Sequence, residues 1–315
     1  MFAIFTLMAS FGIGNSAQGN SITTAVSSTF NVPKWIVGII LVICVGAVVI
    51  GGIKSISKVS SVLVPAMAVF YMIAGILVVC INYKNVPSGI ANIFSMAFGA
   101  KPIAGGLVGT VTASMMNSMR YGIARGLFSN ESGMGSAPIV ASAAQTRNPV
   151  RQAMISSTGT FWDTVVVCLM TGLVLVSSII KNPAIDVSDG GDLTYKAFQQ
   201  IPVIGTPILV IGIAAFAYST ILGWSYYGER CVEYLFGRGG MIPYKLIFVF
   251  ILLIGPVIKL DLVWTMADIF NALMSIPNLI AVVVLSPVVV KETNYYLYGN
   301  RLDEYDKTKL PVVNK

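Results

Sequence analysis

Long apolar runs alternate with short polar connections along the whole chain. Each run is close to the ~20 residues that a helix needs to cross the hydrocarbon core of a bilayer. The pattern therefore predicts an all-α, polytopic membrane protein embedded in a lipid bilayer, with short surface or re-entrant helices at residues 88–98 and 105–116. The predicted spans are residues 1–30, 35–53, 60–82, 119–145, 151–178, 206–227, 242–258 and 262–290.

Composition supports this class, since 56% of the residues are hydrophobic and only 10% are charged. The net charge of +7 raises the question of nucleic acid, but the basic residues lie in short connections between spans, where membrane orientation explains them more simply. We expect no nucleic-acid partner. The chain has no histidine and only four widely spaced cysteines, a pattern that predicts neither a metal cluster nor a disulfide framework.

The basic residues also predict the orientation. If successive connections alternate sides, 12 of the 20 lysines and arginines fall on one face. The opposite connections carry six basic residues together with Asp186, Asp189 and Asp192. Because cytoplasmic connections carry an excess of Lys and Arg, the first face is predicted to be cytoplasmic, and the C-terminal tail, residues 291–315, with it.

The fourth predicted span is interrupted by a polar, glycine-rich segment, residues 129–136, which we call the polar break. Glycines let the backbone leave helical geometry at low steric cost, and a helix that restarts there presents free amides. Those amides suit a substrate carboxylate, and freed carbonyls suit an ammonium group or a sodium ion. The alternative is a helix-packing seam, for which Gly122 and Gly126 supply a GxxxG pattern.

Three acids, Glu131, Asp163 and Asp268, lie inside predicted spans, where each is costly unless it is paired. Arg120 and Arg125 are the expected partners of Glu131, in a structural ion pair that locks the broken helix. A direct role of Glu131 in transport is an equal alternative. Asp163 is expected to be an internal hydrogen-bond hub.

In the span 206–227, Phe216, Ser219 and Thr220 have i, i+3, i+4 spacing and share one helix face. Their hydroxyl and carbonyl oxygens could bind sodium, and Trp224, one turn further on, could cap a small solute. Hydroxyls that only bond back to the preceding turn are the structural alternative. The first span has its own polar interruption, from which Gln18 could reach the same cavity, although helix packing is the commoner role of such residues.

Five stretches resemble the sodium:alanine (alanine/glycine:cation) symporter family: ASFGIGNSAQGNS, RYGIARGLFSNESGMGSAP, GTFWDTVVVCLMTGL, FAYSTILGWSYYGE and ADIFNALMSIPNLIAVVVLS. The resemblance implies sodium-coupled import of small neutral amino acids such as alanine or glycine across the plasma membrane. It also implies a leucine-transporter-like inverted-repeat fold and no cofactor other than sodium as the coupling ion. A transporter of this kind is not an enzyme.

Carried over by position, the resemblance makes the polar break the broken helix of the second repeat, with Ser129, Ser132 and Gly133 among its substrate contacts. Thr220 and Trp224 would line the pocket, and Ser219 and Thr220 would supply half of a sodium site. Asn130 and Gln18 complete the predicted substrate-binding set, and Phe216 completes the sodium-binding set.

The family's first broken helix has no counterpart in residues 1–315, so the chain is expected to be a C-terminal fragment that lacks transport by itself. Two alternatives remain at this stage, an uncoupled channel and an intramembrane aspartyl-type enzyme that uses Asp163 and Asp268. The predicted divisions are residues 1–82 for the end of the first repeat, 83–118 for an extracellular connection, 119–290 for the second repeat and 291–315 for the tail.

Overall fold

The computed structural model describes residues 1–98, 119–120, 122–144, 146, 148–182, 190–255 and 260–304. Within these ranges all regular structure is helical, so the all-α prediction is confirmed. The predicted helix at residues 105–116 lies outside the described residues. So do Asp186 and Asp189 and the end of the tail from residue 305.

The first half of the chain forms one long helical column and two further long helices. The column consists of α1 (Phe2–Phe11), the π-helix η1 (Gly12–Ser16) and α2 (Ala17–Phe30). The predicted interruption of the first span is therefore a π-helical turn inside a continuous helix. The following elements are α3 (Lys34–Ile50), α4 (Gly52–Ile81), the short η2 (Tyr83–Asn85) and α5 (Val86–Phe98).

The second half contains the break and the remaining helices. Residues 122–129 are helical, and the chain resumes as a helix at α7 (Ala137–Ala141). A second column follows, made of α8 (Pro149–Thr160), the π-helix η3 (Phe161–Cys168) and α9 (Leu169–Lys181). The last elements are α10 (Gly190–Phe198), α11 (Gly205–Phe236), η4 (Arg238–Gly240), α12 (Met241–Ile254), α13 (Leu260–Thr293) and the π-helix η6 (Asn294–Tyr298).

Among the described residues, four helical stretches are long and apolar enough to cross a membrane: Gly52–Ile81, Pro149–Lys181, Gly205–Phe236 and Asp268–Tyr298. The shorter α3 is also apolar. Large aliphatic side chains remain exposed along them, as on α13, where the most apolar window is only 6% buried. The length and composition of these helices support the prediction of a multi-pass membrane protein.

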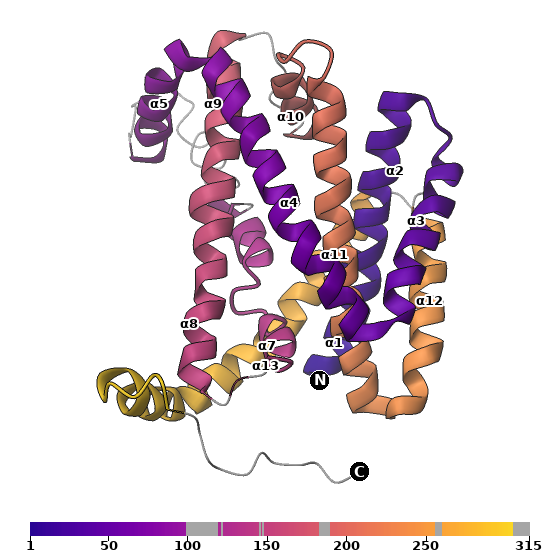
Figure 1. Cartoon of the computed structure of the whole chain (residues 1–315), viewed down its shortest axis with the longest axis vertical. Helices are drawn as coiled ribbons and strands as arrows, with labels where there is room; N and C mark the ends of the chain where they lie inside the picture. Colours follow the sequence, from indigo (N-terminus) through magenta and orange to yellow (C-terminus); the bar gives the residue numbers. More distant parts are fainter. Residues whose placement is uncertain are drawn as a thin grey trace, which may run out of the picture.

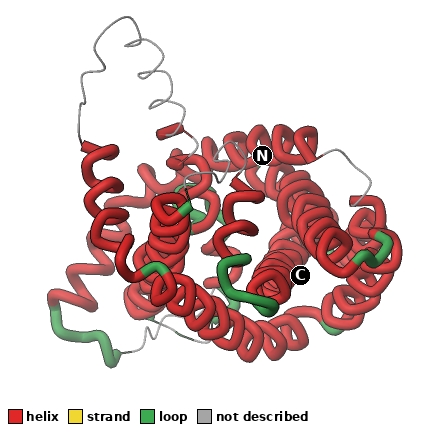
Figure 2. The backbone as a smooth tube through the Cα atoms, turned by 90° about the horizontal axis from the view of Figure 1, so that it is seen from above, coloured by secondary structure: helices red, strands yellow, loops and turns green. Residues whose placement is uncertain are grey.

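The connections gather at two ends of the molecule, as the alternation of spans requires (Figure 1). The α3–α4 turn, the α11–α12 hairpin and the start of α8 lie at the end that also holds the N-terminus and η6. The α2–α3 and α4–α5 connections lie at the other end, together with the last turn of α9. Seen from above, the described chain is almost entirely helical, with short loops joining the helices (Figure 2). Which end faces the cytoplasm stays a prediction.

Helix α11 is the centre of the packing, because it contacts α1, α2 and α4. Its buried side chains include Ile221, Leu222 and Trp224. Glycines on the facing helix allow close approach. A Cβ on Gly14 would lie 2.3 Å from Cβ of Trp224, so only glycine fits at this contact.

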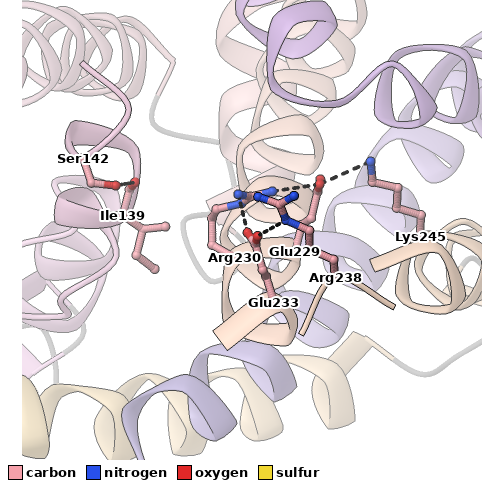
Figure 3. A network of polar contacts seen from close by, with 7 residues as sticks. All are labelled: Ile139, Ser142, Glu229, Arg230, Glu233, Arg238 and Lys245. Atoms are coloured by element: carbon pink, nitrogen blue, oxygen red, sulfur yellow. Dashed lines mark hydrogen bonds and ion pairs between the residues drawn. The ribbon is translucent and has the colours of Figure 1, made fainter. Parts of the chain in front are cut away.

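The helix α11 extends beyond the predicted end at residue 227, because its polar last turns are held by a charged cluster (Figure 3). Glu229 is 2% exposed, and its Oε1 contacts Arg230 Nη2 at 3.0 Å and Lys245 Nζ at 3.3 Å. Arg230 and Arg238 both pair with Glu233. These ion pairs offset the cost of burying the two carboxylates near the apolar core, and the Glu229–Lys245 pair links α11 to α12.

Gly14→Ala should lower the thermal unfolding temperature of the purified protein, because the added methyl group collides with Trp224. Overpacking of this kind costs about 1–3 kcal/mol. Gly12→Ala is the matched control, since a Cβ there meets nothing within 4 Å. Equal unfolding temperatures for the two variants would contradict the packing described here.

Candidate functional site

The polar break is a non-helical interruption of the predicted span at residues 119–145. Residues 130–136 are non-helical, and three of them have positive φ, Glu131 at 52°, Gly133 at 73° and Gly135 at 85°. Glycine adopts this region without the Cβ clash that other residues meet. The chain then re-enters helical geometry at α7, with Pro138 in the first turn.

Neighbouring groups satisfy the polar backbone of the break, as an apolar solvent requires. The amide of Ser132 donates to the Leu127 carbonyl at 3.0 Å, which closes the preceding helix. From α13, the Asn278 amide Nδ2 donates to the Gly133 carbonyl at 3.0 Å. A Cβ on Gly135 would lie 2.8 Å from Asn278 Oδ1, so the approach of α13 depends on glycine there.

The carboxylate of Glu131 turns toward α11. The Tyr227 hydroxyl lies 3.0 Å from both of its oxygens, and the Ser136 hydroxyl donates to Oε2 at 2.9 Å. The predicted ion pair of Glu131 with Arg120 or Arg125 is wrong for the described part of the chain, where Arg125 instead contacts Asp268 at 3.2 Å. The left-handed backbone at Glu131 takes its side chain off the helix face that carries the arginines.

Ser129 and Asn130 face the second column rather than α11. The Ser129 hydroxyl donates to Asp163 Oδ2 at 2.7 Å, and Asn130 Nδ2 donates to the Thr164 hydroxyl at 2.8 Å. Asp163 therefore contacts Ser129, while Asp268 contacts Arg125. The two acids do not form the pair that an aspartyl mechanism would need.

On α11, the hydroxyls of Ser219 and Thr220 donate to the Phe216 carbonyl at 2.8 Å and 3.0 Å. These bonds are the ones expected if both hydroxyls only bond back to the preceding turn of their own helix. Trp224 is buried, and its ring stacks on that of Phe128 at a centroid distance of 6.3 Å. Since Phe128 directly precedes the break, Trp224 lies beside it. Trp224 thus joins the break to the first column.

Of the other predicted residues, Gln18 makes no hydrogen bond to the break. Gln18 Nε2 donates to the Ile13 carbonyl at 3.2 Å, within its own π-helical turn. Ser132 and Gly133 are exposed. In the described part of the chain there is no group of three or more His, Cys, Asp or Glu that could hold a metal ion.

Sequence reasoning missed three residues at the site, Tyr227, Thr164 and Asn278. Tyr227 could have been found, because it follows Trp224 by three residues on the same face of α11. Thr164 adjoins Asp163 but carries no signal of its own. Asn278 looks like an ordinary polar residue after a proline in a predicted span, and only the fold brings it to Gly133.

Gly135→Ala should strongly destabilise the protein, because the new Cβ combines positive φ with collisions at Asn278 and Phe2. We expect a loss above ~1 kcal/mol in the free energy of unfolding. Gly126→Ala, where a Cβ meets nothing within 4 Å, is the matched control and should not lower stability. A thermal unfolding series that ranks the variants the other way would contradict the geometry of the break.

Tyr227→Phe should remove one of the two hydroxyls that hold the Glu131 carboxylate. A hydrogen bond to a charged group contributes about 1.5–3 kcal/mol, so the unfolding temperature should fall. Tyr234→Phe controls for loss of a tyrosine hydroxyl on the same helix, since Tyr234 is 83% exposed. Indistinguishable unfolding curves would show that the Tyr227 contact contributes nothing.

The model of the sodium:alanine symporter family matches residues 1–310. An uncharacterized transporter of Haemophilus influenzae is 44% identical over 314 residues, which cover 98% of this chain and 68% of the relative. The sodium/alanine symporter AgcS of Methanococcus maripaludis is 47% identical over 296 residues, which cover 94% of this chain and 64% of the relative.

A probable sodium/glutamine symporter, GlnT of Bacillus subtilis, is 34% identical over 293 residues, covering 92% of this chain and 59% of the relative. The chain therefore spans roughly two thirds of the length of the curated relatives it matches. The family and these relatives are transporters, which removes the enzyme alternative. With nearly all of its residues matched, the chain belongs to the sodium:alanine symporter family.

Proposed function

We propose that the protein is a sodium-coupled symporter that imports small neutral amino acids such as alanine or glycine across the plasma membrane. One observation carries this proposal: a glycine-rich break in the helix that begins before residue 129, packed against α11 within a predicted span. Lipid-exposed backbone does not tolerate such a break, and in transporters a discontinuous helix at this depth surrounds the solute. Family membership supports sodium and alanine as the pair transported together.

The substrate site draws on Ser129, Asn130, Ser132 and Gly133 from the break. Within the described residues the hydroxyl of Ser132 has no hydrogen-bond partner, so it is available to a solute. Trp224, buried against Phe128, forms an apolar wall beside the break that suits a small side chain. Thr220 and Gln18 complete the set in this proposal.

The sodium site draws on Phe216, Ser219 and Thr220. Both hydroxyls donate their protons to the Phe216 carbonyl, which leaves lone pairs on both oxygens for a cation. Sodium, a hard cation, prefers oxygen ligands. Further ligands would come from the polypeptide that the relatives have beyond the length matched here.

The proposed fold is the leucine-transporter-like inverted repeat, with the first helices of the first repeat outside these 315 residues. In the complete protein, sodium would order the break and α11, and rocking of one helix bundle against the other would expose the amino acid to the cytoplasm. The C-terminal tail would lie on the cytoplasmic side. An uncoupled channel is the competing function, and it would conduct without saturable, sodium-dependent uptake.

Thr220→Val should raise the sodium concentration needed for half-maximal alanine uptake by about tenfold, the effect of losing ~1.4 kcal/mol from one ligand. Uptake would be measured in proteoliposomes that carry the protein in its complete natural form. Ser225→Ala is the control, because Ser225 makes a similar back-bond to Leu222 on the same helix. An unchanged sodium requirement in Thr220→Val would contradict the proposed ion site.

A further inference from the structure

We propose that Tyr227 is a positioning residue that couples the sodium site on α11 to the solute site in the polar break, through its hydrogen bond to Glu131. The inference rests on the proposed sodium-coupled function and deepens it, because it names the contact through which the ion affects the amino acid. It adds no ligand for either of them. Tyr227 acts through Glu131, and Glu131 acts through the backbone of the break.

The first step is the face of α11 that meets the break. Thr220, Trp224 and Tyr227 have i, i+4, i+7 spacing, so they lie on one face of this helix. Thr220 belongs to the proposed sodium site, and Tyr227 lies two turns further on, about 10 Å along the helix axis. A shift of α11 that accompanies ion binding is therefore carried along the helix to Tyr227.

The second step is the set of contacts between this face and the break. The Trp224 ring stacks on that of Phe128, and the Tyr227 hydroxyl lies 3.0 Å from both carboxylate oxygens of Glu131. The rings of Trp224 and Tyr227 pack edge to face, with their centroids 5.5 Å apart. Met134 of the break is 3% exposed and belongs to the same buried cluster. Of these contacts, the one between Tyr227 and Glu131 is a directional hydrogen bond from α11 to the break.

The third step is the backbone conformation of Glu131. Its φ of 52° is left-handed, a conformation that is costly for any residue with a side chain and persists where the surroundings hold it. Within the described ranges, the printed partners of its carboxylate are two hydroxyls, Tyr227 from α11 and Ser136 from the break itself. The Tyr227 bond is the one that ties Glu131 to another helix. Without it, the backbone at Glu131 could relax while α11 stays in place.

The fourth step is the consequence for the two ligands. An ion that favours one position of α11 also favours, through Tyr227, the arrangement of the break that fits this position. Loss of the hydrogen bond leaves each site with its own ligands but lets α11 and the break respond separately. The loss should therefore appear in the effect of one ligand on the affinity for the other, which is a coupling free energy between two sites.

The test is the sodium dependence of alanine binding to the purified complete protein, measured by equilibrium binding of radioactive alanine in sodium and in choline. The readout is the coupling factor, the ratio of the alanine Kd in choline to the alanine Kd in saturating sodium. Tyr227→Phe should lower this factor at least about twofold, the lower end of what substitutions along a coupled network produce. A general loss of stability would reduce the amount of active protein and leave the factor unchanged.

Ser136→Ala is the matched control, because it removes the other hydroxyl partner of the same carboxylate without touching α11. It should keep the wild-type coupling factor. Glu131→Gln should keep most of it, since the amide oxygen still accepts a hydrogen bond from Tyr227. Glu131→Ala should lose as much as Tyr227→Phe, and the two substitutions together should lose no more than either alone, because both remove one contact.

A wild-type coupling factor in Tyr227→Phe would overturn the inference and leave the proposed function intact. So would a loss in Ser136→Ala as large as that in Tyr227→Phe, because the contact with α11 would then have no special part. If alanine affinity of the unmodified protein does not depend on sodium, the proposed function fails, and the inference with it. Should Tyr227→Phe not fold, a wild-type factor in Glu131→Ala overturns the inference.

Discussion

Satisfying polar groups in a medium that offers them no water is the constraint on which this structure depends. The helix that ends at residue 129 resumes only at Ala137, and the intervening backbone must find its partners within the protein. Asn278 supplies one from α13, and Tyr227 supplies another from α11 for the Glu131 carboxylate. Three helical segments are thereby held in one arrangement around the break.

Helix α11 makes this arrangement possible, because it contacts the first column on one side and the break on another. The absence of a side chain at Gly14 lets the first column reach Trp224, and the stacking of Phe128 on Trp224 brings in the break. At its far end the buried Glu229 is shared by Arg230 and Lys245. One helix thus connects an apolar packing centre, a polar site and a charged end.

The local features of the fold could be predicted from the sequence. Apolar runs mark the spans, and glycines beside polar residues mark the break, because these depend on nearby residues. The long-range contacts could not be predicted in this way. Glu131 accepts a hydrogen bond from Tyr227, 96 positions away, and Gly133 accepts one from Asn278, 145 positions away. The expected Glu131–arginine pair was wrong because it assumed that the side chain stays on the face of its helix.

The interruption of the first span shows a similar limit. Its polar residues predict a break, yet the chain remains helical through η1 because α12 satisfies them. Asn15 Nδ2 donates to the Phe248 carbonyl at 2.6 Å. Helix packing, the commoner role of such residues, is the one seen. The pattern of polar residues alone could not distinguish a break filled by a solute from a turn filled by a neighbouring helix.

The central claim is that the polar break binds the transported solute. Hydrogen–deuterium exchange of the complete protein tests it most directly, comparing saturating alanine and sodium with choline and no amino acid. The account predicts slower exchange at amides 130–136, with no change along α12. Equal exchange at those amides in both conditions would contradict it.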